Sequence, residues 1–279
     1  MKTILEVITA TTAYFEKHAV ESPRLNIEHL LAHLLGVKRM ELYMQFDRPV
    51  SPTVLEPLRE LVRRRSLGEP LQHLLGTVEF LGRTFVCDKR ALIPRPETEQ
   101  LCEKLLTERR DTPFTGRVLD IGTGSGVIAL SLAGAWEGAT VEGVDISEAA
   151  LDLARENAQR LGLAERTHFQ RSDLLAAVEG EFELIVANLP YVAAEELQEV
   201  AREVTHDPVN ALVGGEKGTE LIDRLIASAR SHLRGELALE IGRTQAREIC
   251  ARLEDQKYHD IRIEPDYQGH DRFVFAYYG

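Results

Sequence analysis

The chain has 279 residues and a mass of 31.3 kDa, and its 44% hydrophobic and 28% charged residues are ordinary for a globular protein with a substantial core. Its net charge of −12 is unevenly distributed, because residues 1–100 carry 14 basic and 13 acidic side chains whereas residues 101–279 carry 19 basic and 32 acidic ones. The acidic larger region disfavours binding to a phosphate backbone, so we expect no stable nucleic-acid binding.

Targeting segments and metal sites are not expected either. The sequence has no apolar run of about 18 residues, and residues 1–20 contain charged side chains, so we expect neither a membrane span nor a signal peptide and predict a cytoplasmic protein. The nine histidines show no paired ligand spacing, which predicts no metal. The cysteines are scattered and are interpreted as buried filler: Cys87, Cys102 and Cys250.

The first seventy or so residues are predicted to form helices. Apolar residues recur at helical spacing in segments 4–15, 27–35 and 55–62. No catalytic constellation appears among them, so residues 1–72 are predicted to be a small helical bundle used for substrate recognition. The arginine run at 63–65 is more often a solvated helix face than a docking site.

Two serine-proline pairs predict helix starts in this region. Ser22 precedes Pro23, and Ser51 precedes Pro52. We expect each serine to be an N-cap and each proline to occupy the first helical position.

A β-hairpin and a proline-rich segment follow. Residues 76–87 have the aromatic and β-branched content of a hairpin, and the connector is predicted to cover residues 73–95. The next stretch is Leu92-Ile-Pro-Arg-Pro-Glu-Thr-Glu99, in which two prolines enforce extended backbone before a helix starts. It can be read as a stiff linker. Its polar residues could instead line a substrate entrance: Arg95, Glu97 and Thr98.

Residues 96–279 are predicted to form an α/β domain with a doubly wound, Rossmann-like sheet. Apolar strand patterns alternate with helical patterns from residue 117 onwards, as a doubly wound sheet requires. The predicted strands are 118–121, 140–144, 167–170, 182–187, 236–241, 258–263 and 273–277. The predicted helices are 127–135, 147–161, 218–233 and 244–254.

The strand at 182–187 stops abruptly at the tetrapeptide Asn188-Leu-Pro-Tyr191, where we expect the chemistry. Asn188 offers a side-chain carbonyl and Leu189 a backbone carbonyl, and two adjacent acceptors suit one NH2 group. Pro190 cannot donate a hydrogen bond, and Tyr191 adds a flat ring against which a planar amide or base could lie. The alternative is an ordinary strand-ending turn.

A glycine turn at 122–126 joins the first strand of this domain to the next helix. Such a turn lets a ligand approach the backbone, and Asp145 at the end of the second strand suits ribose hydroxyls. These features fit a nicotinamide cofactor as well as an adenosyl one. The dinucleotide fingerprint requires glycine where this chain has Val127, so the spacing favours an adenosyl-sulfonium ligand.

Eight short stretches, taken together, indicate a family. They are Pro70-Leu-Gln-His-Leu-Leu-Gly76, Leu92-Ile-Pro-Arg-Pro-Glu-Thr-Glu99, Leu119-Asp-Ile-Gly-Thr-Gly-Ser-Gly126, Val144-Asp-Ile-Ser147, Asn188-Leu-Pro-Tyr191, Gly214-Gly215, Leu239-Glu-Ile-Gly242 and Gly269-His-Asp-Arg272. They resemble the S-adenosylmethionine-dependent protein-(glutamine-N5) methyltransferases (PrmC/HemK family) that modify class 1 peptide-chain release factors. The match covers nearly the whole chain in order, and the segment at 92–99 is its most discriminating part because generic methyltransferases lack it.

The resemblance implies a helical amino-terminal domain, a hairpin connector and a seven-stranded class I methyltransferase domain with its last strand antiparallel. It implies S-adenosyl-L-methionine as cofactor and the glutamine of a release factor's Gly-Gly-Gln loop as substrate. The residues that would bind the cofactor are Gly122, Thr123, Gly124, Ser125, Gly126, Asp145, Asp173, Leu174 and Asn188. The residues that would hold the glutamine side chain are Asn188, Leu189, Pro190 and Tyr191.

One position departs from the family pattern. The family usually has Asn-Pro-Pro-Tyr, whereas residue 189 here is leucine, so the fixed φ of proline is lost and the loop is expected to be less preorganised.

Asn-Leu-Pro-Tyr also resembles the motif of ribosomal RNA adenine-N6 dimethyltransferases, which are the second candidate for the function of the chain. A third alternative is a nonenzymatic cofactor-binding scaffold. In the favoured interpretation the chain acts as a monomer.

Overall fold

The chain is described by a computed structural model that covers residues 2–112, 114–196, 208 and 211–279. It divides into two compact units, with the boundary between Thr77 and Val78, and each unit is described by itself. No helix in the described part of the chain is both long enough and apolar enough to cross a membrane.

The first unit is helical. Its elements are α1 (Ile4–Lys17), α2 (Pro23–Leu35), the 3-10 helix η1 (Arg39–Gln45), α3 (Pro52–Ser66) and α4 (Leu71–Leu75). The three helices expected from apolar spacing are confirmed, and their apolar stripes meet around the fully buried Phe15, Ile27 and Leu30. The two short helices η1 and α4 were not predicted, because a single turn or two carries too few residues to show a period.

The two predicted serine N-caps are confirmed in position, but their side chains do not cap the helices. Pro23 and Pro52 do open α2 and α3, but neither Ser22 nor Ser51 makes a side-chain cap hydrogen bond. Ser22 has a φ of 45°, outside the extended geometry that aims an N-cap side chain at the first turn. The Ser51 hydroxyl bonds the Thr53 hydroxyl at 2.7 Å instead.

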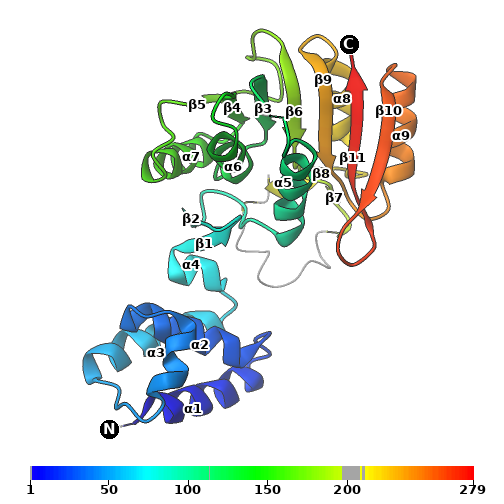
Figure 1. Ribbon diagram of the computed structural model, residues 1–279. Helices are drawn as coiled ribbons and strands as arrows, with labels where there is room; N and C mark the ends of the chain where they lie inside the picture. Colours follow the sequence, from blue (N-terminus) through cyan, green and yellow to red (C-terminus); the bar gives the residue numbers. More distant parts are fainter. Residues whose placement is uncertain (1, 113, 197–207, 209–210) are drawn as a thin grey trace. The chain divides into compact units, whose positions relative to one another are not determined.

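The second unit contains a seven-stranded sheet, whose carboxyl edge carries the site described below (Figure 1). Its strands are β3 (Arg117–Ile121), β4 (Thr140–Asp145), β5 (Thr167–Arg171), β6 (Phe182–Ala187), β9 (Leu233–Glu240), β10 (His259–Pro265) and β11 (Asp271–Tyr278). Their order is β10-β11-β9-β6-β3-β4-β5, and the last strand, β11, pairs antiparallel with both neighbours. The expected sheet and its antiparallel last strand are confirmed.

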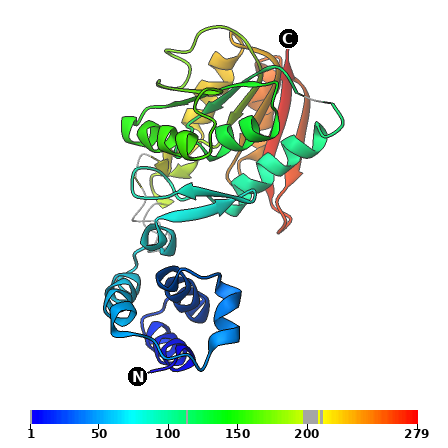
Figure 2. The same ribbon diagram turned by 60° about the vertical axis from the view of Figure 1, so that its left-hand side comes forward.

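Helices cover both faces of this sheet (Figures 1 and 2). Helices α5 (Pro96–Glu108), α6 (Val127–Ala135) and α7 (Glu148–Arg160) pack on one face, and α8 (Glu220–Ala229) and α9 (Ala246–Asp255) pack on the other. The predicted hairpin is present as β1 (Thr77–Phe80) and β2 (Arg83–Val86). A parallel pair of short strands, β7 (Val192–Ala193) and β8 (Val213–Gly215), was not predicted.

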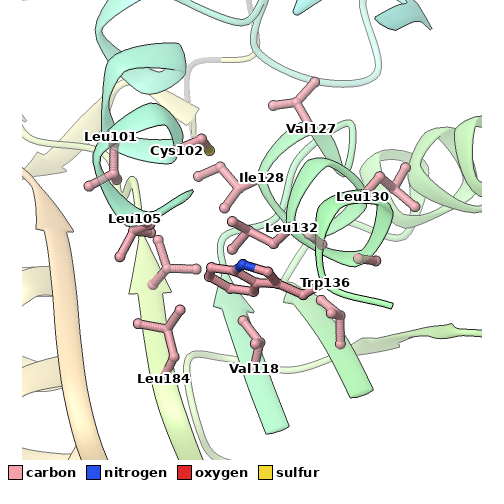
Figure 3. Close-up of a cluster of buried hydrophobic side chains, with 14 of the residues drawn as sticks. Leu101, Cys102, Leu105, Val118, Val127, Ile128, Leu130, Leu132, Trp136 and Leu184 are labelled. Atoms are coloured by element: carbon pink, nitrogen blue, oxygen red, sulfur yellow. The ribbon is translucent and has the colours of Figure 1, made fainter. Parts of the chain in front are cut away.

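Alternation along the central strands divides the core into two layers. Val118 of β3 and Leu184 of β6 contact α5, α6 and Trp136 on one face, as Figure 3 shows. Leu119 and Ile185, one residue further along each strand, belong to the cluster on the opposite face. Both faces are apolar, which explains why these strands read as continuous apolar runs in the sequence.

Asn157 of α7 joins three separate segments of the second unit. This fully buried side chain accepts a hydrogen bond from Val86 N at 2.7 Å through Oδ1. Its Nδ2 donates to Val86 O at 3.2 Å and to Ser125 O at 3.0 Å. The hairpin strand β2 and the turn at 122–126 are therefore held against the same helix.

The Asn157→Ala substitution should lower the free energy of unfolding of the second unit by about 1–3 kcal/mol, because it leaves buried backbone groups without partners. Urea unfolding followed by fluorescence of Trp136, the single tryptophan, reports on this unit. Gln159→Ala, on the exposed side of the same helix, is the control and should change stability by less than about 0.5 kcal/mol. Equal stability of the two variants would contradict the joining role of Asn157.

Candidate active site

A cavity of about 330 Å³ lies at the carboxyl ends of β3, β4 and β6. The strand order reverses between β3 and β6, which is the switch point where open α/β sheets bind ligands. The lining residues come from the ends of these strands, from the segment after β2 and from α8. They include Arg90, Ala91, Leu92, Gly122, Gly124, Asp145, Ser172, Asp173, Leu174, Asn188, Leu189, Pro190 and Arg224.

Gly122 and Gly124 form the cavity wall at the glycine turn. Both have positive φ, 71° and 54°, a conformation that side chains with a Cβ rarely adopt. A Cβ on Gly122 would lie 3.1 Å from the Leu189 side chain, and one on Gly124 would lie 3.9 Å from Ala91. The turn therefore brings bare backbone to the cavity.

The other three predicted residues of the turn lie behind the wall. Thr123 and Ser125 are buried, and neither they nor Gly126 line the cavity. The Thr123 hydroxyl donates to Asp120 Oδ2 at 2.6 Å, and Ala129 N donates to the same oxygen at 3.1 Å. Burial raises the pKa of Asp120 to about 7. Asp120 thus ties the turn to the first residues of α6.

Asp145 lines the cavity at the end of β4, as the sequence predicted. Its Oδ2 accepts a hydrogen bond from Gly124 N at 3.0 Å, and its Oδ1 accepts one from Ser147 N at 2.8 Å. Burial raises the pKa of this carboxyl group. Each oxygen keeps further acceptor capacity, so the side chain fits neighbouring hydroxyl donors such as those of a ribose.

Asp173 and Leu174 also line the cavity, after β5. The Asp173 carboxylate is half exposed and accepts a hydrogen bond from Arg224 Nη2 at 2.9 Å. Leu174 has a φ of 50°. Arg224 was not predicted, since a single arginine on an amphipathic helix gives no functional signal in the sequence.

Asn188 and Leu189 present the two acceptors expected at the end of β6. Asn188 Nδ2 donates to Thr98 Oγ1 at 2.8 Å, and no described residue donates to Asn188 Oδ1 or to the Leu189 carbonyl. The Leu189 side chain is buried, at 4% exposure, in the apolar cluster that covers the α8 and α9 face. Pro190 completes this part of the cavity wall.

Tyr191 does not line the cavity but anchors the tetrapeptide from behind. Its hydroxyl accepts a hydrogen bond from Arg272 Nη2 at 3.1 Å and donates one to Glu240 Oε1 at 3.4 Å. Its backbone carbonyl accepts one from Gln245 Nε2 at 3.0 Å. Burial, with the nearby Glu240, raises the pKa of Tyr191 to about 12. These three hydrogen bonds restrain both the ring and the backbone of Tyr191.

Sequence reasoning missed Glu240, a carboxylate with 1% exposure at the end of β9. Thr98 Oγ1 donates to its Oε2 at 2.8 Å. Burial raises the pKa of Glu240 to about 7, against the opposing effect of this hydrogen bond. The one feature of the sequence that could have identified Glu240 is its place as a charged residue at the end of an apolar strand.

The three residues predicted for a substrate entrance do not line the cavity: Arg95, Glu97 and Thr98. Thr98 instead bonds Asn188. The preceding segment contributes Arg90, which is held by Asp88 and by Glu156 at 2.7 Å. No signal in the sequence identified this segment as a cavity wall.

The donor set favours an organic ligand over a metal. Glycine backbone, the carboxylates of Asp145 and Asp173 and apolar side chains face the cavity, as a nucleoside requires. Within the part of the chain that the structure describes, no group of three His, Cys, Asp or Glu side chains could hold a metal ion.

Comparisons with known proteins agree with this site. Residues 6–76 match the PrmC N-terminal domain, and residues 98–219 match the methyltransferase small domain. A release factor glutamine methyltransferase from Geobacter sulfurreducens is 39% identical over 98% of this chain and 95% of its own length. One from Chlorobaculum tepidum is 37% identical over 96% and 95%.

A solved structure shares the fold. A methyltransferase from Pyrococcus furiosus is 20% identical, with a TM-score of 0.54 over 71% of this chain and 90% of that one. The two curated relatives are similar over nearly their full lengths, and their names agree with the resemblance inferred from the sequence. The chain belongs to the family of release factor glutamine methyltransferases.

Proposed function

We infer that this chain transfers a methyl group from S-adenosyl-L-methionine to the side-chain amide nitrogen, N5, of the glutamine in the Gly-Gly-Gln loop of class 1 peptide-chain release factors. The observation that carries this inference is the pair of acceptors at the cavity wall. Asn188 Oδ1 and the Leu189 carbonyl have no described donor, and both residues line the cavity at the strand switch point. Full-length relatives with this activity in their names support it.

The cavity suits the cofactor. S-adenosyl-L-methionine supplies an electrophilic methyl group when it is bound. Gly122 and Gly124 offer close backbone approach, Asp145 offers acceptors for ribose hydroxyls, and Asp173 with Leu174 offers a wall for the adenine. Thr123, Ser125 and Gly126 act indirectly by shaping the turn.

The acceptor pair addresses the chemical difficulty of the reaction. An amide nitrogen is a poor nucleophile because its lone pair is delocalised into the carbonyl. Acceptance of both N–H hydrogens by Asn188 Oδ1 and the Leu189 carbonyl fixes the direction of the nitrogen. The same two oxygens stabilise positive charge that develops on it. The anchored Tyr191 keeps the tetrapeptide in place.

The remaining features of the proposal concern partners. The release factor is the protein substrate, the chain acts as a monomer in the cytoplasm, and nucleic acid is not a stable partner because residues 101–279 are strongly acidic. An adenine amino group also has two hydrogens for such an acceptor pair, so adenine methylation is the competing outcome of the experiment.

The direct test is methyl transfer from labelled S-adenosyl-L-methionine to a purified class 1 release factor. The same factor with its loop glutamine replaced and purified ribosomal RNA serve as the two comparisons. Label on the wild-type factor alone is the expected result. Label on RNA would replace the proposal with adenine methylation, and no transfer to either would leave a binding scaffold.

Asn188→Ala should lower kcat roughly 100-fold, because one charge-stabilising acceptor is removed. Steady-state kinetics with saturating cofactor and release factor measure this loss. Gln159→Ala removes an exposed amide far from the cavity and should leave kcat unchanged. Near wild-type turnover by Asn188→Ala would exclude the acceptor role.

Asp145→Ala should weaken binding of S-adenosyl-L-methionine about 10-fold or more, because hydrogen bonds to a charged acceptor are lost. Isothermal titration calorimetry measures the dissociation constant, and the Trp136 unfolding curve checks that the fold is intact. Asp152→Ala removes an exposed carboxylate from α7 and should bind as the wild type does. Equal affinities in the two variants would rule out the ribose assignment.

A further inference from the structure

Three side chains from three separate elements form a hydrogen-bonded chain behind the acceptor pair. Glu240 closes β9, Thr98 lies in the first turn of α5, and Asn188 follows β6. Thr98 Oγ1 donates to Glu240 Oε2 at 2.8 Å, and Asn188 Nδ2 donates to Thr98 Oγ1 at 2.8 Å. We name this series Glu240–Thr98–Asn188 the relay.

The inner two members of the relay are shielded from water. Glu240 is 1% and Thr98 is 4% exposed, so their hydrogen bonds are made inside the protein rather than shared with solvent. Removal of its hydrogen-bond partner from a polar group buried in this way destabilises the folded protein. Thr98 is therefore constrained to donate to Glu240 and to accept from Asn188.

The order of donors in the relay follows from the chemistry of its buried end. An ionised carboxylate can only accept hydrogen bonds, so the Thr98 hydroxyl donates its single hydrogen to Glu240. Thr98 then has only an oxygen lone pair with which to bond Asn188. A lone pair attracts the NH2 end of the Asn188 amide and repels its carbonyl end, so the carbonyl oxygen is turned away from Thr98.

We propose that Thr98 and Glu240 are positioning residues that fix the Asn188 amide with its oxygen available to the substrate. This inference rests on the proposed function, because the orientation matters only if Asn188 accepts from a substrate NH2. A flipped Asn188 amide would present its own NH2 to the glutamine NH2, and two donors repel. The relay thereby favours a substrate that places an amide NH2 beside Asn188 Oδ1 over one that places a carboxylate there, because a carboxylate has no hydrogen to donate.

A second arm of Glu240 supports the same loop. Glu240 Oε1 accepts a hydrogen bond from the Tyr191 hydroxyl. Arg272 donates to that hydroxyl through Nη2 and to Ile241 O through Nη1 at 2.9 Å. One buried carboxylate is thus connected to both ends of the tetrapeptide. Glu240 therefore restrains the residues at both ends of the tetrapeptide, Asn188 through Thr98 and Tyr191 directly.

The first test compares Thr98→Val with Thr98→Ser. Valine keeps the shape of threonine but has no hydroxyl, so kcat should fall about 10- to 100-fold, as it does when outer partners of a site are lost, with KM for the cofactor little changed. Serine keeps the hydroxyl and should stay within a few-fold of the wild type. Thr107→Val makes the same change at an exposed position of α5 and is the matched control.

Two outcomes of this comparison would overturn the proposal. Wild-type kcat in Thr98→Val would show that the hydroxyl is not needed. Equal loss in Thr98→Ser and Thr98→Val would assign the effect to packing of the threonine methyl group. Unfolding curves followed by Trp136 fluorescence separate either result from a loss of the folded state.

A second readout does not depend on catalysis. The chain has four asparagines, so selective 15N-asparagine labelling gives few side-chain NH2 signals, and Asn188→Ala identifies the one that matters. That signal should shift and exchange faster with water in Thr98→Val but not in Thr98→Ser or Thr107→Val. If the wild type fails to methylate release factors, the proposed function is wrong, and this signal alone decides whether the relay exists. An unchanged signal in Thr98→Val would exclude it.

The pH dependence gives a third readout. Burial raises the pKa of Glu240 to about 7, so its carboxylate is ionised above that pH and protonated below it. Protonation adds a donor where the relay needs an acceptor, so kcat should fall as the pH decreases through about 7. The charged or titratable groups that face Glu240 are Glu97 and Cys102 on α5, Tyr191 after β6 and Arg272 on β11.

The Glu240→Gln variant assigns this pH dependence. It has no titrating group at this position, so its kcat should decrease less between about pH 8 and 6 than that of the wild type. Asp120 is unaltered in this variant and also has a pKa of about 7, so it causes any decrease common to both proteins. A decrease in Glu240→Gln as large as that of the wild type would count against the relay.

Discussion

Three carboxylates at the carboxyl edge of the sheet, two buried and one partly buried, hold the loops of this site in place. Asp120 bonds the glycine turn and the start of α6, Asp145 bonds the turn and the start of α7, and Glu240 bonds α5 and the ring of Tyr191. In each case a short acidic side chain accepts hydrogen bonds from groups that a loop would otherwise leave without partners. These hydrogen bonds fix the loops that form the cavity wall relative to the ends of the strands.

This arrangement has an energetic cost that explains the shifted pKa values. Burial raises the pKa of Asp120, of Asp145 and of Glu240, so ionising each of them in the folded chain is less favourable than in water. Well-packed apolar residues at these positions would avoid that cost but would release the loops. A site that accepts this loss of stability in return for fixed geometry is typical of catalysis.

The sequence predicted the features that depend on local pattern. Continuous apolar runs identified the central strands, and the tetrapeptide after β6 stood out because Asn188 and Pro190 interrupt such a run. The turn glycines and Asp145 were also located correctly at one edge, since parallel strands end together. The N-cap serines were also located correctly, but their side chains do not cap the helices, and the bond of Ser51 to Thr53 is not visible in the sequence pattern.

What the sequence could not show is contact between residues distant along the chain. Thr98 precedes Asn188 by 90 residues and Glu240 by 142, and only the packing of α5 beside the ends of β6 and β9 brings them together. The roles of Glu240 and Arg272 were hidden for the same reason, although both lie in stretches that carried the family resemblance.

Leu189 is held by apolar packing rather than by the ring of a proline. The family usually has proline at this position, and leucine was expected to leave the loop less preorganised. The Leu189 side chain is instead buried beside the glycine turn and belongs to the apolar cluster around α8. Burial of the side chain restrains the loop although the fixed φ of proline is absent, and the backbone carbonyl remains the second acceptor. The two acceptors are therefore held by different means: Asn188 by one hydrogen bond to Thr98, and Leu189 by apolar packing.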